Sequence, residues 1–302
     1  MSANATDAAP NYRTLLLRLA KAYGRLAYNS LYDWADGRNQ RRSLQRRALL
    51  PEQRFASDYI TLQAAIENVE YLRCNFRDER LMIEFARKIV GTTMVSYQAI
   101  ATLADQVRYC EERGIAGDYV ELGVWKGGCL AVMALANMAF GSERRMIHGF
   151  DSFQGIPLPR RDKDDMVWAR EAMKLTDEQC DGRLVAAEQL IGPKADVEQT
   201  LAGTGYPRDR VRLHEGWFQD TVPIADMDKI AVLRLDGDLY DSYVVALDHL
   251  YDKVQPGGFV IFDDWILEGC RRAVTEFFER RNISPYLCQV DESVRYFQKL
   301  AA

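Results

Sequence analysis

The sequence predicts an α/β fold built on an open, doubly wound sheet whose strands are mostly parallel. From about residue 115 onward, strand-like and helix-like segments alternate, as expected of successive βαβ units. Most strand-like segments are apolar on both faces, which a parallel sheet covered by helices requires. The strand-like segments are 118–125, 145–152, 210–218, 229–238 and 257–265.

The remaining elements of this domain follow from local patterns. A helix is predicted over 242–254, because its apolar residues recur at helical spacing. Pro256, Gly257 and Gly258 are expected to end that helix before the fifth strand begins. Residues 285–300 contain two strand-like runs joined by a polar turn at 291–293, which indicates an antiparallel hairpin at the edge of the sheet.

The N-terminal part of the chain has a different composition. Between residues 13 and 47 there are nine basic residues against two acidic ones, interleaved with leucine and aromatic residues. This pattern predicts a basic amphipathic helix that packs on the body or on a second subunit, with peripheral membrane contact as the less favoured alternative. We therefore expect a helical basic extension over 1–85, a main domain over 86–302, and a homo-oligomer, dimer or higher.

Composition limits the classes of function. A net charge of −5 argues against nucleic-acid binding, so a small-molecule partner is expected. The six cysteines include no C-x-x-C pair, which favours neither a zinc site nor a disulfide framework. With no run of eighteen apolar residues and no signal-peptide pattern at 1–10, we expect a cytoplasmic protein.

Acidic residues and glycines follow the predicted strands at one common edge. In doubly wound sheets, ligands bind beyond the carboxyl ends of the strands. The glycine turn at 121–128, ELGVWKGG, would let a ligand approach backbone N–H groups at a helix N-terminus, although a simple tight turn would read the same. Asp151 at the end of the second strand favours the first interpretation, because an acid there typically holds a ribose diol.

A second group of acids indicates a metal site. The fourth and fifth predicted strands should be neighbours, so Asp236 can meet Asp263 and Asp264 at the same edge. Three carboxylates would repel one another unless a cation lies between them, and oxygen ligands suit Mg²⁺, with Mn²⁺ or Ca²⁺ as alternatives. Solvated acids or a helix N-cap are the competing explanation, which fits Asp241 best.

Six motifs in this order resemble those of the macrocin O-methyltransferase family, over about residues 80–300. They are TTMVS (92–96), ELGVWKGG (121–128), FDSFQGIP (150–157), EGWFQDTVP (215–223), LRLDGDLYDS (233–242) and PGGFVIFDDW (256–265). Members of that family use S-adenosylmethionine and Mg²⁺ to methylate sugar hydroxyls, chiefly on antibiotics. The resemblance implies a Rossmann-like class I methyltransferase domain with a seven-stranded sheet.

The resemblance also implies roles for individual residues. Asp238 would be the general base, and Asp236, Asp263 and Asp264 would bind the metal. The residues implied to lie around S-adenosylmethionine are Thr93, Met94, Glu121, Gly123, Asp151, Ser152, Gly216, Trp217, Phe218 and Asp236. Asp238 would share a face with Asp236 if the strand continued through Gly237, whereas a turn there would alter this arrangement.

The expected function is therefore O-methylation of a sugar hydroxyl on a glycosylated natural product or glycan. A phenolic or catechol acceptor is the alternative within the same chemistry. Two other classes fit less well. A Mg²⁺-dependent phosphatase of the haloacid dehalogenase type would leave the glycine turn unexplained, and a non-catalytic cofactor-binding protein would not need intact acids at every predicted metal position.

Overall fold

The computed structural model describes residue 66 and residues 77–300, all of which belong to one compact unit, Phe55–Ala302. The predicted basic helix at 13–47 lies outside the described residues. Helix α3, Arg77–Lys88, crosses the predicted boundary at residue 85, and its side chains Phe85 and Ala86 are buried in the core. The position of the domain boundary stays a prediction.

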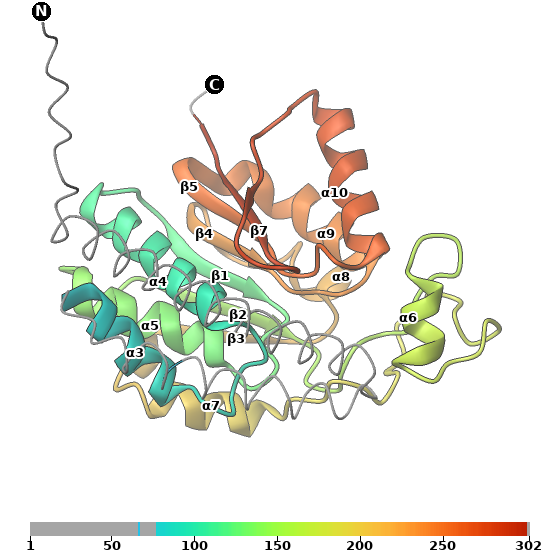
Figure 1. The fold of residues 1–302 in the computed structure, drawn as a ribbon, viewed down its shortest axis with the longest axis horizontal. Helices are drawn as coiled ribbons and strands as arrows, with labels where there is room; N and C mark the ends of the chain where they lie inside the picture. Colours follow the sequence, from blue (N-terminus) through green and yellow to red (C-terminus); the bar gives the residue numbers. More distant parts are fainter. Residues whose placement is uncertain (1–65, 67–76, 301–302) are drawn as a thin grey trace, which may run out of the picture. The chain divides into compact units, whose positions relative to one another are not determined.

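The described chain forms a seven-stranded sheet with the strand order β3-β2-β1-β4-β5-β7-β6 (Figure 1). Strands β1 to β5 pair in parallel, β7 is antiparallel to β5, and β6 is antiparallel to β7. Their bounds are β1 Asp118–Leu122, β2 Ile147–Asp151, β3 Val211–Glu215, β4 Ile230–Leu235, β5 Val254–Phe262, β6 Cys288–Gln289 and β7 Arg295–Gln298. The predicted doubly wound fold and the C-terminal antiparallel hairpin are confirmed.

Helices cover both faces of the sheet, and an apolar core lies on each face. One core joins side chains of α3, α4, α5 and α7 to alternate strand residues such as Tyr119 and Ile147. The other core joins α9 and α10 to the strand residues that face the opposite side of the sheet, such as Val120 and Phe150. The remaining helices are α4 Tyr97–Glu112, α5 Gly128–Phe140, α6 Met166–Glu171, α7 Lys194–Ala202, α8 Phe218–Thr221, α9 Tyr240–Leu250 and α10 Glu268–Arg281, with 3₁₀ turns η1 Arg208–Arg210 and η2 Tyr251–Lys253. Within these described ranges, no helix combines the length and apolarity needed to cross a bilayer.

The boundary between helix α9 and strand β5 differs from the prediction. Helix α9 ends at Leu250, and β5 already begins at Val254, so Pro256 and Gly257 lie inside the strand. Ile230 of β4 pairs with Val254, whereas Val232 pairs with Phe259. More residues of β5 than of β4 span the same stretch, and the excess forms a bulge at the Pro-Gly-Gly sequence. The prediction that this sequence separates helix from strand was wrong.

Candidate active site

The site lies where the three central strands, β1, β4 and β5, end side by side. The backbone N–H of Asp236 donates to the Leu122 carbonyl of β1 at 2.9 Å, and that of Asp263 donates to the Leu235 carbonyl of β4 at 2.9 Å. These hydrogen bonds continue the parallel ladder one residue past each strand. The first side chain after β4 and the first after β5 are thereby fixed at one edge of the sheet.

Three carboxylates meet at this edge. Asp236, Asp263 and Asp264 each offer an oxygen, and these oxygens all lie within 4.8 Å of one another. The structure thus brings together the three acids that the sequence placed in one group, although they come from two strands and are separated by 27 and 28 positions in the chain. Their role as metal ligands stays a prediction at this point.

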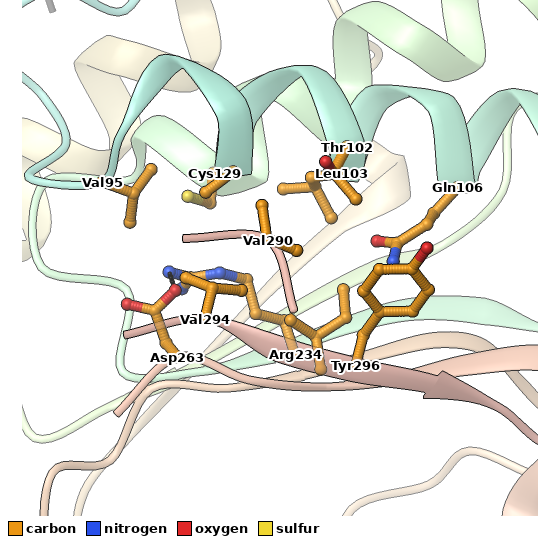
Figure 2. Close-up of a pocket in the computed structure, with 12 residues that line it drawn as sticks. Val95, Thr102, Leu103, Gln106, Cys129, Arg234, Asp263, Val290, Val294 and Tyr296 are labelled. Carbon is orange, nitrogen blue, oxygen red and sulfur yellow. Dashed lines mark ion pairs between the residues drawn. The ribbon is translucent and has the colours of Figure 1, made fainter. Parts of the chain in front are cut away.

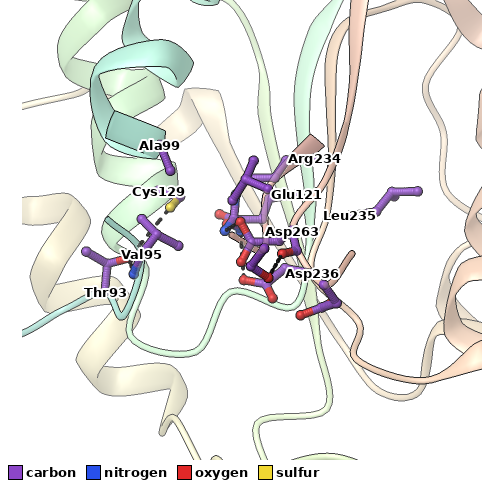
Figure 3. Close-up of polar contacts among 12 residues, drawn as sticks. Thr93, Val95, Ala99, Glu121, Cys129, Arg234, Leu235, Asp236 and Asp263 are labelled. Carbon is purple, nitrogen blue, oxygen red and sulfur yellow. Dashed lines mark hydrogen bonds and ion pairs between the residues drawn. The ribbon is translucent and has the colours of Figure 1, made fainter. Parts of the chain in front are cut away.

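Arg234 is the central residue that the sequence analysis missed. Its side chain is 3% exposed and contacts three carboxylates: Glu121 of β1, Asp236 at 2.8 Å and Asp263 at 2.6 Å (Figure 3). A signal for it exists in the sequence, since an arginine inside a strand that is apolar on both faces must find a partner when buried. The guanidinium links the end of β1 to the acids after β4 and β5.

The carboxyl groups at the site outnumber the one positive charge that contacts them, Arg234. Burial raises the pKa of Glu121 to about 8, despite the attraction of Arg234. Burial likewise raises the pKa of Asp263 to about 7. For Asp264, burial followed by repulsion from Asp238 and Asp236 holds the pKa well above its ordinary value. Such shifts disfavour the ionised forms, and a divalent cation among the carboxylates would reverse them.

Asp238 is placed by a turn and not by strand alternation. Strand β4 ends at Leu235, and Asp238 adopts a left-handed φ of 57°. Its backbone N–H donates to Oδ2 of Asp264 at 2.9 Å. The condition for a shared face, a strand continuing through Gly237, is therefore not met, yet the turn still holds Asp238 directly beside the three clustered acids.

The glycine turn after β1 approaches the acids closely. Gly123 has a φ of +83°, and a Cβ there would lie 1.7 Å from the Asp236 carbonyl oxygen. The turn is held by Asp151, whose Oδ2 accepts the N–H groups of Val124 at 2.9 Å and Trp125 at 3.2 Å, while its Oδ1 accepts that of Phe153 at 2.7 Å. Asp151 thus shapes the loop, and its binding of a ribose stays a prediction.

The other predicted cofactor residues surround the same edge. Thr93 is buried with its Oγ1 3.7 Å from Cys129 Sγ in the first turn of α5, and Met94 beside it is half-buried. Ser152 uses its hydroxyl internally, donating to the Gly155 carbonyl at 2.6 Å.

The turn between β3 and α8 contributes the last three predicted residues. The Gly216 N–H donates to the Asp151 carbonyl at 3.0 Å, and Trp217 is the N-cap of α8. The ring of Phe218 would lie 3.1 Å from a Cβ built on Gly237, so this turn reaches the Asp236–Asp238 segment.

A long segment between β2 and α7 is anchored over the same region. Asp164 is buried, and its Oδ1 accepts the Tyr240 N–H at the start of α9 at 2.7 Å. Arg160 forms an ion pair with Asp241 in the first turn of α9 at 3.0 Å. Asp241 therefore lies in the first turn of α9, but the N-cap is Leu239, so the expectation of an N-cap at Asp241 is wrong. The segment is tied down at the N-terminus of α9 immediately after Asp238.

A small cavity extends from the acids into the core between α4 and the sheet (Figure 2). Arg234 and Asp263 line one part of it, and Gln106 of α4 lines another. The Gln106 side chain is buried, and neither its Oε1 nor its Nε2 has a hydrogen-bond partner among the described residues. An unpaired buried amide is destabilising, and the cavity is where water could satisfy it.

We expect Gln106→Leu to raise the free energy of unfolding by about 1–3 kcal/mol, because it removes an unpaired buried amide at similar volume. Urea unfolding measures this difference. The matched control is Gln98→Leu on the exposed side of the same helix, which should change stability by less than about 0.5 kcal/mol. A clear loss of stability in Gln106→Leu would show that the amide is hydrogen-bonded in solution, most directly to water in the cavity.

Comparison with known proteins agrees with this architecture. The model of the family described as macrocin O-methyltransferase (TylF) matches residues 42–299. A tetracenomycin rhamnosyl 4′-O-methyltransferase of Streptomyces olivaceus is 36% identical over 217 residues, covering 70% of this chain and 77% of the relative. The mycinamicin III 3″-O-methyltransferase of Micromonospora griseorubida is 33% identical over 212 residues, covering 70% and 80%.

Solved structures share the fold as well. The O-methyltransferase NovP matches with a TM-score of 0.58 and 31% identity, covering 70% of this chain and 83% of that one. The calicheamicin methyltransferase CalS11 matches with a TM-score of 0.53 and 18% identity, covering 78% and 91%, which supports the fold alone.

Proposed function

The chain belongs to the macrocin O-methyltransferase (TylF) family and is a methyltransferase, and from this premise we propose that it methylates a sugar hydroxyl on a glycosylated natural product. S-adenosylmethionine is the proposed methyl donor and Mg²⁺ the proposed metal. The observation that carries this proposal is the meeting of Asp236, Asp263 and Asp264 beside the glycine turn. Methyl transfer to a weakly acidic hydroxyl needs both of these features at one place.

The donor set fits a hard divalent cation. All three side chains are carboxylates, the ligand type that Mg²⁺ prefers, and only one buried cation, Arg234, contacts them among the described residues. When bound, Mg²⁺ would supply positive charge that lowers the pKa of nearby sugar hydroxyls, and S-adenosylmethionine would supply the methyl group. Asp236, Asp263 and Asp264 would orient the acceptor by holding the cation at the edge of the sheet.

An unpaired polar atom supports the cofactor position. Glu121 is 1% exposed, and its Oε2 has no hydrogen-bond partner among the residues described, whereas its Oε1 contacts Arg234. A buried acceptor atom without a donor is costly unless a ligand supplies one, and the cofactor's amino group is such a donor. Gly123 and Asp151 would border the rest of the cofactor, since Gly123 lies in the turn after β1 and Asp151, at the end of β2, accepts hydrogen bonds from that turn.

Asp238 is the proposed general base. It follows β4 by three positions, and its backbone contacts the Asp264 carboxylate, so its side chain belongs to the same small region. Asp238 would accept the proton of the acceptor hydroxyl as the new carbon–oxygen bond forms and the carbon–sulfur bond breaks. A base adjacent to the metal is what this chemistry needs, because the hydroxyl is acidified there.

The acceptor class rests on the relatives. Their names place methylation on a rhamnosyl group of a tetracenomycin in one case and on mycinamicin III in another. We extend this to a sugar of an antibiotic-like glycoside for the present chain. A cytoplasmic location and a homo-oligomeric state remain predictions.

Calorimetry with S-adenosylmethionine, with and without Mg²⁺, tests the proposal together with methyl transfer to a panel of glycosides and catechols. We expect cofactor binding in both conditions and transfer to a glycoside only when Mg²⁺ is present. Exclusive methylation of catechols would replace the sugar acceptor by a phenolic one. Absence of any cofactor binding would overturn the methyltransferase mechanism for this chain.

A further inference from the structure

The three proposed metal ligands share a feature that the proposed function does not require: each has one carboxylate oxygen in contact with a donor or a positive charge of the protein. For Asp236 and Asp264 the contact is a hydrogen bond, and for Asp263 it is an ion pair without a hydrogen bond. Oδ2 of Asp236 contacts Arg234 Nη1 at 2.8 Å, and Oδ1 of Asp263 lies 2.6 Å from Arg234 Nη2. Arg234 therefore holds one oxygen of each of two different ligands. The guanidinium of Arg234 is itself held by an ion pair with Glu121 of β1.

Asp264 is held in the same way by different donors. Its Oδ2 accepts the Asp238 N–H at 2.9 Å and lies 2.9 Å from the Tyr243 hydroxyl. That hydroxyl also lies 2.9 Å from the Leu235 carbonyl, but the carboxylate is the stronger acceptor for its single proton. Tyr243 is fully buried, so this contact does not exchange with solvent.

The second oxygen of each carboxylate is left over. No hydrogen bond between residues 77–300 reaches Oδ1 of Asp236, Oδ2 of Asp263 or Oδ1 of Asp264. A cation at this edge would therefore receive one oxygen from each aspartate. Two-oxygen binding by Asp236 or Asp263 would need the contact with Arg234 to break.

We propose that Arg234 and Tyr243 make this site selective for Mg²⁺ over Ca²⁺ by allowing each aspartate to offer only one oxygen. Mg²⁺ takes six ligands and retains several waters, whereas Ca²⁺ takes six to eight oxygens and commonly uses carboxylates with both oxygens. Three single oxygens suit Mg²⁺, which keeps several waters, whereas Ca²⁺ would lose the two-oxygen carboxylate contacts that commonly bind it and would have to be completed by water. Outer contacts of this kind orient metal ligands generally.

This inference rests on the proposed metal site, and titration calorimetry with Mg²⁺ and with Ca²⁺ tests it without an activity assay. Arg234→Lys keeps the buried positive charge but loses the two-pronged contact. We expect the Mg²⁺ affinity to fall roughly 10- to 100-fold, with a much smaller change for Ca²⁺, so that the preference for Mg²⁺ shrinks about tenfold or more. If Arg234 acted only through its charge, the affinities for Mg²⁺ and Ca²⁺ would change by similar factors.

Tyr243→Phe is the second variant, because it removes one hydroxyl from a buried ring and retains the Asp238 N–H contact. We expect a smaller loss of preference, roughly two- to threefold, in the same direction. An unchanged ratio of the two affinities in both variants would overturn the inference while leaving the proposed function intact. Failure of the wild-type protein to bind either ion would overturn the metal requirement of the proposed function and this inference with it.

Discussion

The Asp263→Asn variant should lose Mg²⁺-dependent methyl transfer and still bind S-adenosylmethionine. An amide in place of this carboxylate removes one of three anionic ligands and breaks the ion pair with Arg234. Stabilisation of developing charge by a metal is worth several kcal/mol, so we expect kcat/KM to fall roughly a thousandfold or more. Calorimetry on the same preparation measures binding of Mg²⁺ and of the cofactor separately.

Asp238→Asn is the matched control, since it makes the same carboxylate-to-amide change 25 positions earlier at the same edge. It should retain Mg²⁺ binding and lower kcat by about 10²- to 10⁴-fold, the usual contribution of a general base. If Asp263→Asn lost cofactor binding but its methyl transfer still depended on Mg²⁺, the assignment of Asp263 to the metal and of the glycine turn to the cofactor would be wrong. Wild-type activity in Asp238→Asn would exclude it as the base.

The location of this site could be predicted from the sequence because parallel strands impose it. Once the apolar segments before Asp236 and Asp263 are read as neighbouring strands, the residues that follow them must meet at one edge. Hydrogen bonds one residue beyond each strand show how directly this occurs. The hairpin at the end of the chain was predictable for a similar reason, because its two runs are local and joined by a short polar turn.

What the sequence could not provide depends on contacts between distant segments. Two of the three acids that Arg234 contacts, Glu121 and Asp263, belong to other segments of the chain, and nothing local indicates them. The end of β4 at Leu235, which decides how Asp238 is placed, is a choice of backbone turn that residue alternation does not determine. Gly257 looked like the end of a helix, but it lies inside β5 as part of a bulge, and its N–H donates to the carbonyl of Lys299, one residue past β7.

Gly123→Ala should destabilise the fold more than any other substitution considered for the described residues. The new Cβ would lie 1.7 Å from the Asp236 carbonyl oxygen, so the backbone of either the glycine turn or the first residue after β4 would have to move. Both are fixed by ladder hydrogen bonds of 2.9 Å, from Gly123 N–H to Phe150 and from Asp236 N–H to Leu122. We expect a loss of more than about 4 kcal/mol in the free energy of unfolding, or failure to fold.

Gly91→Ala separates this close contact from backbone strain. Gly91 has a φ of +85°, nearly the same as the +83° of Gly123, but nothing lies within 4 Å of a Cβ built there. Its replacement should therefore cost only the left-handed backbone term, about 1–2 kcal/mol. Urea unfolding of both variants gives the difference, which isolates the approach of the glycine turn to Asp236. Equal losses of stability in the two variants would mean that the glycine turn can move away from Asp236. Gly123 would then have no role in setting the distance between this turn and the clustered acids.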